Sequence, residues 1–101
     1  MQTEINGDTA RIIPEGSIDL TNAEKLKEEF ENLVENEEIL QVTIDFKNVE
    51  KIDSSGLGKI LLFHKIMEER EGSIQLANVD SEYIQKVFEM VNLDEIIDIR
   101  K

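Results

Sequence analysis

Cysteine and tryptophan are absent from this sequence of 101 residues, and proline and histidine each occur once. The lack of cysteine excludes disulfides, thiolate metal sites and thiol nucleophiles. No apolar run approaches the roughly 20 residues that a membrane-spanning helix needs. The N-terminal residues Met1-Gln2-Thr3-Glu4 have neither the basic region nor the apolar stretch of a secretion signal. We therefore expect a cytoplasmic protein that does not insert into a membrane.

Positive charge is also scarce, since 23 acidic residues stand against 11 basic ones and give a formal net charge of -12. Such a field repels phosphate backbones and anionic lipids, so we expect no binding to nucleic acid or to membrane surfaces. The surplus of acid either solubilises exposed helix faces or steers the protein toward a basic face of a partner protein, and the two effects are compatible. The length is that of one domain, residues 1–101.

The spacing of apolar residues predicts a compact α/β domain with a mixed, largely parallel sheet of four to five strands and three or more helices. The expected strands cover residues 2–5, 10–13, 40–46 and 73–79. Asn6-Gly7 lies between the first two strands and predicts an N-terminal hairpin. Residues 47–52 are expected to form a connector, and residues 96–99 either a short strand or a helical turn.

Three helices are expected between and after these strands. The first is capped by Thr21 or Asn22 and runs to about Glu35, and the second covers about 55–70, with Gly72 as its stop signal. The third begins after Asp80 or Ser81 and extends to about Val91. Two strand-helix-strand units of this kind imply right-handed crossovers between parallel strands.

The segment Asp53-Ser54-Ser55-Gly56-Leu57-Gly58 carries most of the functional information. It follows an apolar strand and begins an amphipathic helix, so it places two adjacent hydroxyls at a helix start beside small glycines, with Gly56 leaving room for a partner's active site. A hydroxyl in this position can cap the helix, attack a substrate or be phosphorylated. Only one residue can be the N-cap, so capping explains one member of the segment and leaves another hydroxyl free.

A phosphoryl group on that hydroxyl would add about -1.5 to -2 units of charge near a helix N-terminus, whose dipole and free N–H groups partly tolerate it. Asp53, together with Asp19 and Asp45 if they converge there, would repel it. We expect the main effect at a docking partner rather than on the fold of the chain itself.

Nucleophilic catalysis by the chain has little support. A hydrolase elbow requires Gly-x-Ser-x-Gly, and Asp53 stands two residues before Ser55. His64 lies about 13 Å from Ser55 along a helix that rises 1.5 Å per residue, which is too far for direct proton transfer. We expect His64 to be a packing or surface residue.

Ligand sites are equally weak in the sequence. Gly56, Gly58 and Lys59 match neither of the common glycine-rich phosphate-binding motifs. Asp19 and Asp45, even with Asp53, have a spacing that matches no standard metal-ligand motif. We therefore expect no cofactor and no metal.

The runs Val42–Phe46 and Ile52–Gly58, joined by a short connector containing Val49, resemble the STAS domain of bacterial anti-sigma factor antagonists. The segment Gly16-Ser17-Ile18-Asp19 before the first helix is similar to the family's first strand-to-helix junction. The order of elements matches from near residue 2 to about residue 99. The resemblance implies that Ser55, the hydroxyl directly before the first glycine, is the phosphoacceptor. It also implies supporting or partner-binding roles for Asp19, Asp53, Ser54 (as a cap or neighbour), Gly56, Leu57 and Gly58.

The resemblance further implies a partner-switching cycle. The unphosphorylated form binds an anti-sigma factor that is also a serine kinase, and a sigma factor is freed. The kinase uses ATP and magnesium to phosphorylate the antagonist, which then dissociates, and a separate serine phosphatase resets it. The chain would be a substrate and no enzyme. The alternatives are a STAS scaffold or accessory subunit of a stress-signalling or transport complex, and a nucleotide-binding regulatory module.

Overall fold

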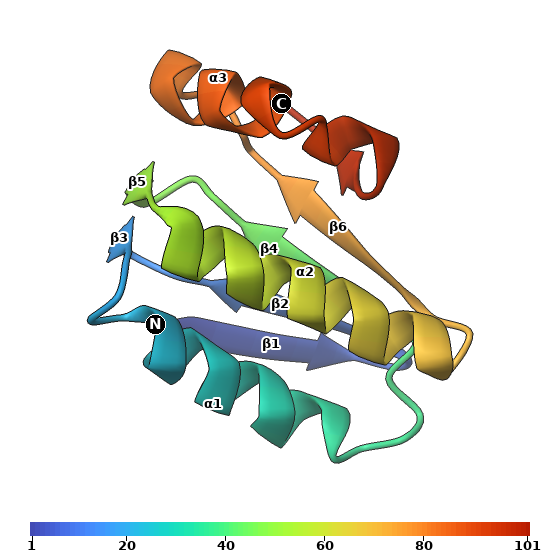
Figure 1. The fold of residues 1–101 in the computed structure, drawn as a ribbon. Helices are drawn as coiled ribbons and strands as arrows, with labels where there is room; N and C mark the ends of the chain where they lie inside the picture. Colours follow the sequence, from blue (N-terminus) through green and yellow to red (C-terminus); the bar gives the residue numbers. More distant parts are fainter.

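Two sheets and three α-helices make up the structure, a computed structural model that describes residues 1–101 (Figure 1). The strands are β1 (Gln2–Asn6), β2 (Thr9–Ile13), β3 (Gly16–Ile18), β4 (Gln41–Asp45), β5 (Val49–Ile52), β6 (Ser73–Ala77) and β7 (Asp98–Ile99). The helices are α1 (Ala23–Val34), α2 (Ser54–Glu69), α3 (Glu82–Met90) and the single 3-10 turn η1 (Leu93–Glu95). None of the helices is both long and apolar enough to cross a lipid bilayer.

The larger sheet has the strand order β1-β2-β4-β6-β7. The hairpin β1–β2 is antiparallel and turns through Gly7, whose φ of 65° suits glycine, while all other pairs in this sheet are parallel. The parallel pair β3–β5 forms a separate two-stranded sheet. The predicted α/β fold with a mixed, largely parallel sheet, an N-terminal hairpin and three helices is confirmed.

The spacing of apolar residues did not predict two short strands, although the resemblance placed a strand-to-helix junction at Gly16–Asp19. Residues 47–52 were expected to be a connector, but Val49–Ile52 forms β5, which pairs with the three-residue strand β3. In β5 the two end residues are buried and the two central ones are exposed, so the strand lacks the alternation by which a strand is recognised. Of the two alternatives expected for residues 96–99, the structure has the strand, since Asp98–Ile99 forms β7. The turn η1 covers Leu93–Glu95 and precedes this segment.

The helices α1 and α2 lie side by side over one face of the larger sheet (Figure 1). Phe30 of α1 stacks on Phe63 of α2 with ring centroids 4.1 Å apart, and both side chains are fully buried. Phe46 and Phe88 meet edge to face at 5.6 Å and join α3 to the end of β4. The first pair therefore packs α1 against α2, and the second packs α3 against the end of β4.

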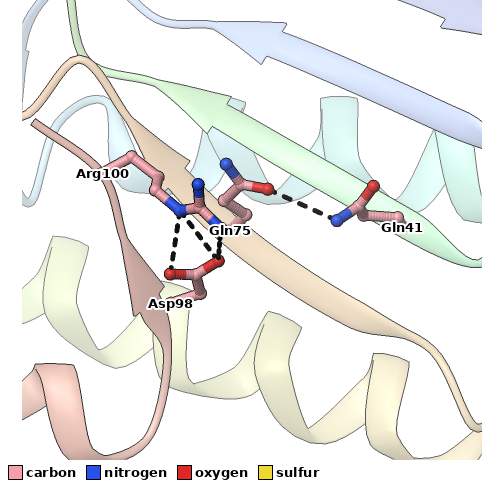
Figure 2. A network of polar contacts seen from close by, with 4 residues as sticks. All are labelled: Gln41, Gln75, Asp98 and Arg100. Atoms are coloured by element: carbon pink, nitrogen blue, oxygen red, sulfur yellow. Dashed lines mark hydrogen bonds and ion pairs between the residues drawn. The ribbon is translucent and has the colours of Figure 1, made fainter.

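The opposite face of the sheet is polar. Along β2, β4 and β6, alternate residues such as Arg11, Thr43 and Gln75 turn polar side chains to this face. A hollow there is lined mainly by Glu4, Asn6, Thr9, Arg11, Gln41, Thr43 and Gln75. Gln41 Nε2 donates to Gln75 Oε1 at 3.4 Å. The Asp98–Arg100 ion pair lies beside these two residues (Figure 2). The sheet therefore has one apolar face under the helices and one polar face, as expected for half-buried strands.

The end of α2 differs in detail from the prediction. The helix ends at Glu69, and the positive φ of 60° belongs to Glu71, so a glutamate rather than a glycine adopts the left-handed conformation. The Gly72 amide donates to the Met67 carbonyl at 2.7 Å. A Cβ atom on Gly72 would lie 2.4 Å from the Leu40 carbonyl oxygen, so glycine is needed here for close approach.

Candidate functional site

Asp53 is the N-cap of α2. Its backbone is extended, with φ -116° and ψ -173°, and its Oδ1 accepts a hydrogen bond from the Gly56 amide at 3.1 Å. The Leu57 amide donates to the Asp53 carbonyl oxygen at 3.0 Å and starts the helix. Ser54 is the first helical residue, so the expectation that Ser54 could be the cap is wrong. Neither serine hydroxyl therefore serves as the N-cap of α2.

The second carboxylate oxygen of Asp53 fixes a distant loop. Its Oδ2 accepts from the Leu20 amide at 3.2 Å, and the Asp53 amide donates to the Ile18 carbonyl oxygen at 3.2 Å. On the other side of Leu20, the Asp19 Oδ1 accepts from the Thr21 and Asn22 amides at 3.0 and 3.2 Å and turns the chain into α1. The two aspartates therefore hold the loop before α1 against the start of α2.

Ser54 and Ser55 line a shallow groove of about 250 Å³ between the starts of α1 and α2. Ser54 is exposed and Ser55 is half-buried. The remaining lining residues are Leu20, Ala23, Glu24, Gly58, Lys59 and Leu62. The backbone N–H groups of Ser54 and Ser55 donate to no group of the protein, as is usual in the first turn of a helix. The groove therefore combines two hydroxyls with free donors and with the positive end of a helix dipole.

The two glycines of the segment have different roles. Gly56 is buried, and a Cβ atom there would lie 2.5 Å from the Ile18 carbonyl oxygen and 2.8 Å from Ile52 Cγ1. Gly56 thus lets α2 approach the β3–β5 pair and does not open space for a partner, contrary to our expectation. Gly58 has nothing within 4 Å of such a Cβ atom and is the glycine that keeps the groove open. Leu57 is half-buried and packs against the core.

An ion pair forms one side of the groove. Lys59 Nζ lies 2.8 Å from Glu24 Oε1, and the lysine side chain is 23% exposed against 65% for the glutamate. The hydrogen bond and the charge of Lys59 hold the pKa of the Glu24 carboxyl below its ordinary value. Because Lys59 is the better buried partner, its ammonium stays at the groove while Glu24 reaches in from α1.

Two exposed leucines flank the hydroxyls. Leu20 is 78% exposed although its amide is fixed by Asp53, and Leu62 is 37% exposed. The two side chains add apolar surface to the groove that the hydroxyls line. Sequence reasoning missed both leucines as site residues. For Leu20 the only signal was an apolar residue between polar neighbours, which is common on protein surfaces.

Asp45 does not belong to the groove, so the expectation that it converges with Asp19 and Asp53 is wrong. It shares the polar sheet face with Arg11, whose Nη1 lies 2.7 Å from Asp45 Oδ2. Asp45 Oδ1 accepts from Asn78 Nδ2 at 2.9 Å and from the Lys47 amide at 3.0 Å. Burial alone would raise the pKa of Asp45, but the hydrogen bonds from Asn78, Lys47 and Arg11, with the charge of Arg11, outweigh burial and lower it.

His64 lies on α2 as the predicted packing or surface residue. Its side chain is 21% exposed, and its Nε2 lies 3.4 Å from Glu68 Oε1. It does not line the groove of Ser55. No group of acidic or histidine side chains in the structure is arranged to hold a metal ion. The groove therefore combines two hydroxyls with a single carboxylate, that of Glu24, which is paired with Lys59.

Comparison with known proteins assigns the chain to a family. The model of the STAS domain matches residues 1–101. The chain belongs to the STAS domain family. Among curated STAS relatives, the anti-sigma-B factor antagonist of Bacillus subtilis (strain 168) is 34% identical over 84 residues, which cover 83% of this chain and 74% of that protein.

Solved structures agree with this assignment. A Thermotoga maritima crystal structure, described as that of a candidate anti-sigma factor antagonist, matches with a TM-score of 0.89 and 25% identity, over 99% of this chain and 85% of that one. The phosphorylated form of the Bacillus cell fate determinant SpoIIAA matches with a TM-score of 0.75 and 23% identity, over 99% of this chain and 90% of that one. The STAS fold thus extends over nearly the whole chain.

Proposed function

We propose that this STAS protein is an anti-sigma factor antagonist that is switched off by phosphorylation at Ser55. The observation that carries the proposal is the groove itself. Two hydroxyls that do not act as N-caps stand at the start of α2, next to the exposed side chain of Leu20, whose backbone amide is held by Asp53. The name of the Bacillus subtilis relative supports the antagonist role. SpoIIAA, which shares the fold, is described in both phosphorylated and unphosphorylated forms, and this supports the switch.

The unphosphorylated groove suits docking of an anti-sigma factor. Its neutral hydroxyls and the apolar side chains of Leu20 and Leu62 can be buried at low cost, since no unpaired charge enters the interface. The acidic surface of the chain, with its net charge of -12, favours encounter with a basic face of the partner. Binding in this form would occupy the anti-sigma factor and free the sigma factor.

Phosphorylation would reverse this preference. The partner, acting as a serine kinase with ATP and magnesium, would transfer the γ-phosphoryl group to Ser55 Oγ and leave ADP. Its own base would take the proton, since Glu24, the one carboxylate of this chain that lines the groove, is paired with Lys59. The phosphoryl group adds about -1.5 to -2 units of charge to an interface that must be desolvated, which disfavours docking. A separate serine phosphatase would hydrolyse the phosphoserine, and the chain itself would be a cytoplasmic substrate and no enzyme.

A binding experiment with charge-adding variants tests the proposal. Wild type, Ser55→Ala and Ser55→Asp, with Ser73→Asp as control, would be immobilised as baits for native-host lysate, with mass spectrometry of the retained proteins. Ser73 is exposed and follows the far end of α2, so the control adds the same charge away from the groove. We expect wild type, Ser55→Ala and the control to hold an ATP-binding kinase that Ser55→Asp loses. The retained kinase, purified and supplied with ATP and magnesium, should phosphorylate wild type at Ser55.

Three other outcomes would contradict the proposal. Modification that persists in Ser55→Ala and maps to Ser54 would show that the other hydroxyl is the acceptor. Retention of the same large scaffold or transporter by every bait would favour a scaffold or accessory subunit. A rise in melting temperature with millimolar ATP or GTP would favour a nucleotide-binding module.

A further inference from the structure

We propose that, when Ser55 is phosphorylated, the Lys59 side chain gives up its ion pair with Glu24 of α1 and binds the new phosphoserine, which lies on α2 like Lys59 itself. This inference rests on the proposed function and describes how the ion pair at the same site would respond to phosphorylation. In the unphosphorylated structure, Lys59 Nζ is bound to Glu24 Oε1 at 2.8 Å and thereby joins α2 to α1.

Lys59 is placed to reach both acceptors. Ser55 and Lys59 are four residues apart on α2, so their side chains lie on the same face one turn apart. Both residues line the same groove as Glu24. The lysine can therefore exchange acceptors by side-chain rotation, with no change in the backbone.

The phosphate is the stronger acceptor. It carries about -1.5 to -2 units of charge and three oxygens, against one unit of charge on a carboxylate. Ser55 also lies at the positive end of the α2 dipole, beside two amides that donate to no group of the protein. Each oxygen of the nearby Asp53 carboxylate already accepts from one amide, that of Gly56 or of Leu20, and Asp53 forms no ion pair with Lys59.

Glu24 can release the lysine easily. Its side chain is 65% exposed and lies in the first turn of α1, where water and the helix dipole stabilise its charge. The other cation that acts on Glu24 is Lys27, also on α1. After the exchange, the groove would present an unpaired carboxylate on α1 as well as a phosphate on α2. The new negative charge would then extend across both helices that face a docking partner.

The test uses the full chain with phosphoserine incorporated at position 55 during translation, so that it does not depend on any kinase or partner. We would titrate the phosphoserine by phosphorus NMR and the Glu24 carboxyl by carbon NMR. The variants are Lys59→Gln and, as control, Lys65→Gln, which removes an exposed lysine about 15 Å from Ser55 along α2, at 1.5 Å per residue.

The proposal requires the second pKa of the phosphoserine to be about 0.3 lower in wild type and in Lys65→Gln than in Lys59→Gln. Phosphorylation should also raise the pKa of Glu24 more in wild type than in Lys59→Gln, because simple repulsion by the phosphate is present in both. Equal phosphoserine pKa values in wild type and Lys59→Gln would overturn the exchange. A Glu24 pKa that rises equally in both proteins would do the same. Either result leaves the partner-binding experiment with Ser55→Asp unaffected, so the two proposals fail separately.

Discussion

Asp53 and Leu20 are 33 residues apart in the sequence, and one hydrogen bond of 3.2 Å from the Leu20 amide to Asp53 Oδ2 joins them. The same carboxylate caps α2 through the Gly56 amide. One side chain therefore both starts the helix that carries the serines and fixes the exposed leucine next to them. The stability of the helix start and the shape of the proposed docking surface depend on the same residue.

Replacing Asp53 should separate these two roles. Asp53→Ala removes both hydrogen bonds and should lower the free energy of unfolding by about 1–2 kcal/mol, measured by urea denaturation. Asp53→Asn keeps one side-chain oxygen that can accept from the Gly56 amide, and asparagine is as good an N-cap as aspartate. This variant should therefore lose much less of the free energy of unfolding. Hydrogen exchange at the Leu20 amide should be faster in both variants. An equal loss of stability in the two variants would contradict the assignment of the cap.

The two glycines of the serine segment should respond to alanine in opposite directions. Gly56→Ala places a methyl group against the Ile18 carbonyl oxygen and Ile52, and should lower the free energy of unfolding by about 1–3 kcal/mol. Gly58 lies within α2, and a methyl group added there would meet no neighbouring atom. Gly58→Ala should therefore raise the free energy of unfolding by about 0.5–1 kcal/mol. The same methyl group narrows the groove, so Gly58→Ala should bind the partner more weakly despite its greater stability. Thermal melts and a binding titration on the same samples measure both effects.

Asp45 should make stability depend on pH. Its pKa is lower in the folded than in the unfolded state, so its contribution is fully present above the unfolded value of about 3.9 and is lost as pH falls through the folded value. Wild type should therefore exceed Asp45→Asn by about 1.5–3 kcal/mol at pH 7, and the difference should shrink below pH 4. Urea denaturation between pH 7 and pH 2.5 measures the difference.

The matched control for this titration is Asp80→Asn, since Asp80 is an exposed aspartate for which the structure shows no ion pair or side-chain hydrogen bond. Its difference from wild type should stay close to zero at every pH. A gap between wild type and Asp45→Asn that widens in acid would refute the pairing of Asp45 with Arg11 and Asn78 as the source of the low pKa.

Leu20→Ala should weaken partner binding without affecting the fold. The side chain is 78% exposed, so its removal should change the free energy of unfolding by no more than about 0.5 kcal/mol. If Leu20 is buried in the complex, binding should lose more than about 1 kcal/mol, or roughly fivefold in affinity. Met90→Ala is the control, because Met90 is 82% exposed and does not line the groove. Equal affinities for Leu20→Ala and wild type would exclude Leu20 from the interface.

Local patterns in the sequence predicted the large elements because each of them has a strong period. In β4 the buried residues alternate with half-buried ones, and α1 buries Leu26, Phe30 and Leu33 at helical spacing. The strands β3 and β5 are three and four residues long, which is too short for a period to emerge. Their pairing depends on contacts between distant segments, which a local pattern does not contain.

The sequence predicted only the part of the candidate site that is formed by consecutive residues. The segment 53–58 indicated hydroxyls at a helix start, and the structure places both serines there. Leu20 and Glu24 come from a different part of the chain, and nothing in the sequence around either residue indicates that it contacts the start of α2. The expectation that Asp45 lies near Asp19 and Asp53 was wrong, because strand alternation turns its side chain to the polar face of the sheet, where it pairs with Arg11.

The pairing of β3 with β5 has a practical consequence for how the serines would be recognised. A synthetic peptide of residues 50–62 would contain both hydroxyls and both glycines, yet it would lack Leu20, Glu24 and the Ile18 carbonyl against which Gly56 packs. In such a peptide Asp53 could still cap a nascent helix, but nothing would hold the leucine beside it. A kinase that recognises Ser55 through the groove would therefore be missed by peptide arrays and by searches for linear consensus motifs, because the residues around the serines come from distant parts of the chain.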